Sequence, residues 1–230
     1  MPQKICPAGP LVKIIANLAT IMRKYSFILA AAVAALAVSA CGNQAGDNQQ
    51  SAENVVIETI MSRRSIRQYK DTPVEREKLQ IIAECGVNAP NGMNSQRWEV
   101  RIVDNPESLA AITEKFKIAN PEMVARDANF KNMFRNAPAV IFIAVPNEDD
   151  GVNAGLMGEN MIIAAQSMGL GTVCLGGPVN FLRNTDDGRA FLEKLGFSEG
   201  YRLLYMIGVG YPDETPDAKP RDLSKIRFID

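Results

Sequence analysis

The chain has 230 residues, of which 47% are hydrophobic and 22% are charged, and its formal net charge at pH 7 is -1. This composition is typical of a globular protein with one sizeable core, and the near-neutral charge excludes a bulk electrostatic attraction to nucleic acid. The sequence contains no histidine. A Ser-His-Asp triad, a Cys-His pair and a histidine-ligated metal or haem are therefore excluded, and we expect any demanding chemistry to reside on a bound cofactor.

The N-terminal region has the pattern of an export signal. Arg23 and Lys24 precede an uncharged, mostly apolar stretch, residues 26–38, which is short for a membrane span and typical of a signal-peptide core. Residues 38–41 (VSAC) resemble the lipobox of bacterial lipoproteins, in which the cysteine is lipidated and becomes the new N-terminus. This resemblance makes Cys41 the predicted lipidation site.

The predicted organisation has three parts. Residues 1–40 form the signal segment, and Met22 is a candidate for the true start because a signal begins its chain. Residues 41–54 are rich in Gly, Asn, Gln, Asp and Ser and form a flexible, lipidated tether, and residues 55–230 form the folded domain. An uncleaved N-terminal anchor helix is the open alternative to the signal. Both alternatives place the protein in the cell envelope, anchored to a membrane and outside the cytoplasm.

Apolar patterning from residue 55 onward predicts helices mixed with apolar strands, which indicates a sheet buried between helices in an α+β or α/β layered fold. Thr72, Pro73 and Glu75 have the spacing of a capping box, so we expect a helix that begins here and runs to about Val87. Further helices are expected at residues 55–61, 106–117, 121–136, 151–168 and 181–195, a loop at residues 88–97, and strands at residues 98–104, 139–145, 171–175 and 202–210.

The cysteines argue against a metal cluster. Cys6, Cys41, Cys85 and Cys174 are far apart and form no CxxC pair. Cys85 and Cys174 lie in apolar sequence, where a buried free thiol is the default, while a disulfide between them stays open.

Four large apolar side chains stand among charges in the predicted helix 121–136. For Met123, Phe130, Met133 and Phe134, we favour packing against a partner or a lid over contact with a cofactor.

Three arginines and a serine fall within five residues, at Arg63, Arg64, Ser65 and Arg67. A guanidinium stays charged at any working pH and presents five donors in a fixed fork. Several of them that converge on one point need an anionic partner, and a phosphate fits best. The alternative is a solvated basic helix end, where cations suit the helix dipole.

Two motifs stand at a characteristic order and spacing: residues 63–69 (RRSIRQY) and residues 89–98 (APNGMNSQRW). Two weaker motifs follow them, residues 169–172 (GLGT) and residues 219–221 (KPR). Together they resemble the nitroreductase family of FMN-dependent oxidoreductases over nearly the whole predicted domain. The resemblance implies a homodimer of α+β subunits, each with a central mixed or antiparallel sheet flanked by helices, and FMN in a cleft at the dimer interface.

The resemblance also implies residues that bind FMN, with no catalytic side chain and no metal ligand among them. They fall into a group for the phosphate and ribityl chain, a loop that contacts the flavin, main chain that passes along the ring, and a C-terminal basic pair that reaches back to the phosphate. In that order they are Arg63, Arg64, Ser65 and Arg67; Pro90, Asn91, Asn94 and Gln96; Leu175, Gly176 and Gly177; and Lys219 and Arg221.

Two departures from the family pattern are visible. Arg97 stands where the family often has a proline before the tryptophan, and it either alters the loop or adds a cation near the flavin. Residues 178–180 lack the carboxylate that many members carry there.

The activity implied by the resemblance is hydride transfer on a flavin. FMN would accept two electrons from a donor, with NADH or NADPH as candidates, and would pass them through N5 to a small, flat, electron-poor acceptor of the nitroaromatic or quinone type. Reductive dehalogenation or ring dehydrogenation is an alternative within the family. Outside it, the alternatives are a non-catalytic lipoprotein that binds flavin or another phosphorylated ligand, and a surface lipoprotein without a cofactor. The expected partners are a small-molecule substrate, a second copy of the chain and a membrane through the lipid anchor, but not nucleic acid.

Overall fold

The computed structural model describes residues 54–229. The predicted signal segment, the predicted lipidation site at Cys41 and nearly all of the predicted tether lie outside the described residues. Within residues 54–229, no helix combines the length and the apolar character that a membrane crossing requires.

The chain divides into two compact units, Met1–Ile57 and Glu58–Asp230. Residues 54–57 are the described part of the first unit, and they are helical. The second unit begins with helical residues 58–62, so the helix predicted from the apolar spacing is confirmed.

The second unit is built on an antiparallel sheet with the strand order β1-β2-β4-β3. The strands are β1 Glu99–Val103, β2 Ala139–Val145, β3 Gly171–Leu175 and β4 Arg202–Gly210. β2 lies inside the sheet and is covered on both faces, which explains why all of its residues are apolar and buried. The last three strands begin and end where the sequence predicts, and an α+β fold with a sheet flanked by helices is confirmed.

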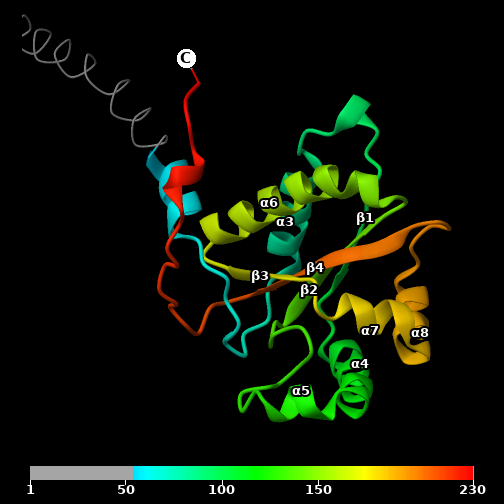
Figure 1. Cartoon of the computed structure of the whole chain (residues 1–230). Coiled ribbons are helices and arrows are strands. Elements are labelled where there is room, and N and C mark those ends of the chain that lie inside the picture. Colours follow the sequence, from blue (N-terminus) through cyan, green and yellow to red (C-terminus); the bar gives the residue numbers. More distant parts are fainter. Residues whose placement is uncertain (1–53, 230) are drawn as a thin grey trace, which may run out of the picture. The chain divides into compact units, whose positions relative to one another are not determined.

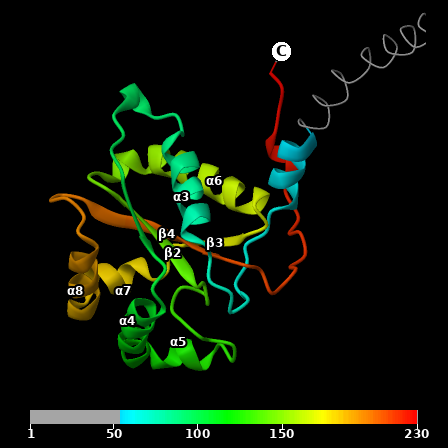
Figure 2. The same ribbon diagram turned by 180° about the vertical axis from the view of Figure 1, so that it is seen from behind.

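The helices form a layer on each face of this sheet. Figures 1 and 2 show α3 and α6 together on one face, and α4, α7 and α8 on the other. The elements are α3 Arg76–Val87, α4 Pro106–Ala119, α5 Pro121–Ala125, α6 Gly151–Ser167, α7 Val179–Asn184 and α8 Asp186–Leu195, with 3-10 turns at Gly92–Asn94, Glu148–Asp150 and Leu223–Lys225.

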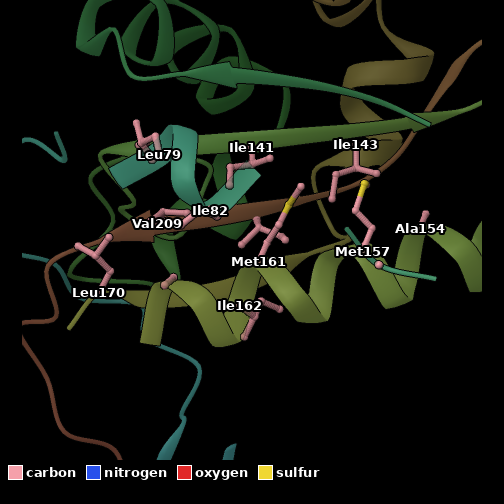
Figure 3. Packing of buried hydrophobic residues seen from close by; sticks show 14 of the residues in the cluster. Leu79, Ile82, Ile141, Ile143, Ala154, Met157, Met161, Ile162, Leu170 and Val209 are labelled. Atoms are coloured by element: carbon pink, nitrogen blue, oxygen red, sulfur yellow. The ribbon is translucent and has the colours of Figure 1, made fainter. Parts of the chain in front are cut away.

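The alternation of β2 side chains builds two separate cores. Ile141 and Ile143 join the core under α3 and α6, where Met157 and Met161 of α6 lie against them (Figure 3). Phe142 points to the opposite face and joins the core with residues of α4 and α7. Successive strand residues point to opposite faces, so one apolar strand supplies both layers.

A bulge in β4 keeps this pattern intact. Tyr205 pairs with Ile143 and Leu203 pairs with Ala144, so Leu204 is the extra residue of β4. Leu203 and Met206 thereby reach the same core although they are three residues apart.

The predicted capping box is wrong. Residues 72–75 are not helical, and α3 begins at Arg76 with Glu75 as an extended N-cap without a side-chain cap bond. The Glu75 carboxylate instead accepts hydrogen bonds from the Tyr211 hydroxyl at 2.8 and 3.0 Å and from Lys78 Nζ at 3.3 Å. Its side chain therefore holds the chain that follows β4, and it is not available to cap the helix.

The predicted helix over residues 121–136 is also wrong, because α5 ends at Ala125. Backbone N–H groups of the following loop donate to side-chain oxygens of Asn132 and Asn136, which replace helical carbonyl acceptors. Arg135 and Asn136 are left-handed, with φ of 56° and 67°. A right-handed helix cannot continue through two such residues.

The predicted helix 181–195 is two helices. Thr185 is extended, with ψ of 156°, and its hydroxyl accepts from the N–H of Gly188 at 3.0 Å. It therefore ends α7 and is the N-cap of a separate helix, α8. The expectation of two buried thiols is wrong for Cys174, which is exposed, while Cys85 is half-buried, and both are free.

Candidate functional site

The segment with the three arginines is attached to the edge strand β3. Ser65 forms a parallel bridge with Thr172, and the N–H of Ile66 donates to the Thr172 carbonyl at 2.9 Å. Gly171 allows this close approach, because a Cβ there would lie 2.6 Å from Cγ1 of Ile66. The arginine segment, residues 63–67, is therefore fixed relative to the sheet.

The chain that follows β4 pairs with the same part of the molecule. The N–H of Lys70 donates to the Tyr211 carbonyl and the N–H of Asp213 donates to the Gln68 carbonyl, both at 2.9 Å. The Glu214 carboxylate accepts from the backbone N–H groups of Arg67 and Gln68. The C-terminal tail is thus brought next to the arginine segment, as the two ribbons show in Figures 1 and 2.

A small cavity of about 110 Å³, here called the cation cavity, lies where the two segments meet. Its lining holds five basic side chains and one carboxylate, and within residues 54–229 none of the five basic groups forms an ion pair. Unpaired cations at one point favour an anionic ligand. The lining residues are Arg63, Arg64, Ser65, Arg67, Pro216, Asp217, Lys219 and Arg221.

Three of the four arginines of this cavity donate to nearby backbone carbonyls: Nη1 of Arg67 donates to Ser65 at 3.1 Å, Nη1 of Arg221 donates to Lys219 at 3.0 Å, and Arg64 makes two such bonds. Nη1 of Arg64 donates to the carbonyls of Met61 and Arg63, each at 2.8 Å, so part of the donor capacity of Arg64 is used at its own helix end. Arg67 makes one longer bond of this kind and also lines a second cavity, so Arg63 and Arg67 are the candidates for contacts with an anion.

A second cavity of about 300 Å³, here called the apolar cavity, adjoins the first through Arg67, which lines both. Its lining is mainly aromatic and aliphatic, and Phe116 and Phe130 stack in it with ring planes 8° apart. A slot of this kind suits a flat ring. The lining residues are Arg67, Phe116, Met123, Asp127, Phe130, Asn132, Met133, Arg135, Val173, Cys174, Leu175, Gly176, Gly177 and Pro178.

Bare main chain borders this slot after β3. A Cβ at Gly176 or Gly177 would meet nothing within 4 Å, so packing within the described chain does not require glycine at either position. Two adjacent residues without side chains let a ligand approach the backbone closely. The prediction that Leu175, Gly176 and Gly177 lie along one slot is consistent with this geometry.

Cys174 is the exposed thiol of the apolar cavity. Desolvation raises its pKa, the nearby Glu159 carboxylate adds to this, and Arg63 opposes it. The group therefore stays a protonated thiol at neutral pH and not the thiolate that acts as a nucleophile.

The loop of residues 90–96, which holds the other predicted flavin-binding residues, lies away from both cavities. The N–H of Gly92 donates to Oδ1 of Asn153 in α6, and within residues 54–229 neither cavity is lined by Pro90, Asn91, Asn94 or Gln96. The same loop is strained, with positive φ at Met93, Asn94 and Gln96.

Arg97 adds no charge to either cavity. Its Nε lies 3.3 Å from Oδ2 of Asp150, a buried carboxylate just before α6. This ion pair fits the expectation that Arg97 alters the loop, and the expectation of a cation near the flavin stays a prediction.

Sequence reasoning missed one side of the apolar cavity. Met123, Phe130 and Met133 line it, although packing or a lid was favoured over contact with a cofactor. The loop of residues 126–137 supplies the polar lining groups Asp127, Asn132 and Arg135 as well, and none of the recognised motifs covers them. The sequence signal that could have indicated a loop here is the pair Asn132 and Asn136, whose side-chain amides accept hydrogen bonds from its backbone.

Comparisons with known proteins agree with this fold. The model of the Nitroreductase family matches residues 60–211. The NADPH-flavin oxidoreductase of Vibrio harveyi is 30% identical over 176 residues, which cover 73% of this chain and 70% of that protein. The oxygen-insensitive NADPH nitroreductase of Salmonella typhimurium is 30% identical over 171 residues, which cover 72% of this chain and 69% of that protein.

The solved structures lead to the same family. A nitroreductase with bound FMN from Desulfitobacterium hafniense superimposes with a TM-score of 0.65 and 26% identity over 76% of this chain and 98% of that chain. The family model covers well over half of the residues, and the arginine segment falls inside it. The chain belongs to the Nitroreductase family.

Proposed function

We propose that this protein is an FMN-dependent oxidoreductase in which the cation cavity holds the cofactor's phosphate and the apolar cavity holds its ring. The observation that carries this proposal is the meeting of Arg63, Arg67, Lys219 and Arg221, from opposite ends of the domain, beside an apolar slot that shares Arg67.

The residues present fit FMN. A phosphate monoester carries about -1.5 to -2 charge at neutral pH, and the cation cavity offers five cations against the single carboxylate of Asp217. The apolar cavity offers aromatic side chains and the bare main chain at Gly176 and Gly177. When bound, FMN supplies hydride and electron transfer. The chain's own residues bind the phosphate, orient the ring and exclude water, which requires no histidine.

A homodimer is part of the proposal. Asn94 and Gln96 lie away from both cavities of their own protomer, in a strained loop that is exposed, so we assign their flavin contacts to the site of the partner. Large apolar side chains are exposed on the helical layer of α3 and α6, among them Ile81, Val152 and Leu156. Exposed apolar surface of this kind marks a protein interface. Sedimentation analysis tests this, and a monomer with a full flavin content contradicts it.

For the reaction, we propose NADH or NADPH as donor and a small nitroaromatic or quinone as acceptor. The relatives named above use NADPH by their names, which supports a nicotinamide donor. The purified protein should be yellow, NADPH should bleach its absorbance, and p-benzoquinone or a nitrobenzoate should restore it. Stable flavin that no acceptor reoxidises would favour the non-catalytic binding protein, and a colourless protein that takes up no FMN would exclude both.

We also propose a lipid anchor at Cys41 that holds the domain in the cell envelope, on the strength of the lipobox-like sequence alone. Incorporation of labelled palmitate tests this proposal. Label in the wild type that is lost in Cys41→Ala supports it, and label that persists in the variant contradicts it.

A further inference from the structure

The loop of residues 126–137 forms one wall of the apolar cavity without regular secondary structure between Arg126 and Ala137. It places Asp127, Phe130 and Arg135 in the cavity lining. Such a loop needs a specific anchor, since it has no ladder of backbone hydrogen bonds to fix it. The anchor decides where this wall stands relative to the rest of the site.

The Asn136 side chain is that anchor. It is 9% exposed, and its Oδ1 accepts from the N–H groups of Lys131 at 2.7 Å and Asn132 at 3.2 Å. Its Nδ2 lies 3.0 Å from the Asn129 carbonyl. One amide therefore holds the loop closed upon itself.

The same amide reaches out of the loop to the arginine segment. Nδ2 of Asn136 donates to the carbonyl of Arg67 at 3.3 Å and contacts Oε1 of Gln68 at 3.4 Å. Arg67 is the residue that lines both cavities. The wall of the ring slot is thus tied to the backbone of a residue whose side chain lines the neighbouring cation cavity.

The backbone of the loop has an unfavourable conformation next to this contact. Arg135 and Asn136 are both left-handed, and a non-glycine residue in that region is disfavoured. Asparagine tolerates this conformation better than most residues, and its amide offers an oxygen acceptor and an NH2 group with two donors in one side chain. The chain therefore holds an unfavourable backbone at the place where the loop meets Arg67.

We propose that Asn136 is a positioning residue that sets the width of the ring slot by holding the loop of residues 126–137 against the arginine segment. This inference rests on the proposed function. Asn136 itself does not line either cavity within the part of the chain that the structure describes, so it acts through the residues that it places.

The test variant is Asn136→Asp. Aspartate keeps the size, the oxygen acceptor and the tolerance for a left-handed backbone, but it removes the Nδ2 donor and sets a carboxylate against the carbonyls of Arg67 and Asn129. The matched control is Asn129→Asp, which adds the same charge to the same loop at an exposed side chain.

Equilibrium binding of FMN and of riboflavin, which lacks the phosphate, separates the two cavities. Asn136→Asp should weaken both ligands by the same factor, about tenfold from the lost hydrogen bonds, and Asn129→Asp should change neither. Hydrogen exchange of the apoprotein should show faster exchange across residues 126–137 in Asn136→Asp, with β2 unchanged.

Three results overturn the inference. Riboflavin affinity that stays at the wild-type value in Asn136→Asp would show that the residue only stabilises the fold, whatever the melting temperature. If Asn136→Asp binds FMN more weakly but riboflavin normally, then Asn136 affects the cation cavity and not the ring slot. A wild-type chain that binds neither flavin would overturn the proposed function and this inference with it, whereas normal wild-type binding leaves the proposed function standing when only the variant result fails.

Discussion

The carboxylate of Glu214 accepts a hydrogen bond from the backbone N–H of Arg67, a residue that stands 147 positions earlier in the chain. The same oxygen accepts from the N–H of Gln68 at 3.2 Å. An acidic side chain of the tail therefore fixes the backbone of an arginine that lines both cavities. The contact uses the carboxylate as an acceptor for backbone groups, and the guanidinium of Arg67, which donates through Nη1 to the Ser65 carbonyl, keeps its remaining donors for a ligand.

Glu214→Ala should weaken FMN binding, because the backbone N–H groups of Arg67 and Gln68 both lose their carboxylate acceptor. Glu214→Gln keeps an acceptor and removes a negative charge near the cations, so FMN affinity should be retained or raised. Fluorescence titration of FMN with each variant checks this pair. Equal loss in both variants would mean that the charge, and not the acceptor, is what the site needs.

Replacement of Arg63 and Arg67 together by alanine should release FMN. Each guanidinium that contacts the phosphate contributes a charge-assisted hydrogen bond of about 1.5–3 kcal/mol. Flavin content after gel filtration is the measurement, and Arg189→Ala is the control, since Arg189 pairs with Asp186 on α8. Full flavin content in the double variant would contradict the proposal that Arg63 and Arg67 bind the phosphate of FMN.

Gly171→Ala should lower the free energy of unfolding by about 1–3 kcal/mol, because the new Cβ would overlap Ile66 and force the arginine segment off β3. Gly155→Ala in α6 is the matched control. Its Cβ would meet nothing within 4 Å, and alanine is favoured over glycine in a helix by up to about 1 kcal/mol. Urea denaturation of both variants is the measurement. A steric effect destabilises Gly171→Ala alone, whereas equal changes in the free energy of unfolding of both variants would contradict the steric explanation.

Gly176→Val should leave stability within about 0.5 kcal/mol of wild type, since the position faces open space. Binding of both FMN and riboflavin should fall sharply, because the new side chain occupies the entrance of the ring slot. Thermal unfolding of the apoprotein and flavin titration are the two measurements. Unchanged riboflavin binding would show that the ring does not lie along this main chain.

The ion pair of Arg76 and Asp104 predicts a pH dependence of stability. The hydrogen bond from Arg76 at 2.6 Å lowers the pKa of Asp104 below its unfolded value, so the pair stabilises the fold above that value, about 3.9. The contribution is lost as pH falls through the lower, folded pKa. Asp104→Asn should therefore be less stable than wild type at pH 7, and the difference should shrink in acid. A difference in unfolding free energy that is constant from neutral pH into acid would contradict this.

The sequence was sufficient for the parts of the fold where one pattern dominates. β2, β3 and β4 are short apolar runs between turn residues, and burial on the sheet leaves them no competing structure. The meeting of Arg63 with Lys219 in one cavity was also predicted, although only by resemblance. Spacing alone contains no information on which distant segments pair with β3.

The errors occurred where polar side chains replace backbone partners. Glu75 was expected to complete a capping box, but its carboxylate binds Tyr211, a residue that the local sequence does not reveal. Asn136 was expected inside a helix, but its amide takes backbone groups of the loop and of Arg67. Both side chains bind residues that only the tertiary fold brings near, and such contacts override local propensity.

The account depends most on the cation cavity as a site for a phosphate monoester. The most direct measurement is the dissociation constant of the apoprotein for FMN against that for riboflavin, in the same buffer free of phosphate. We predict that FMN binds far more tightly than riboflavin and that added salt narrows the gap. Equal affinity for the two flavins would contradict the central claim, because the five cations would then contribute nothing to binding.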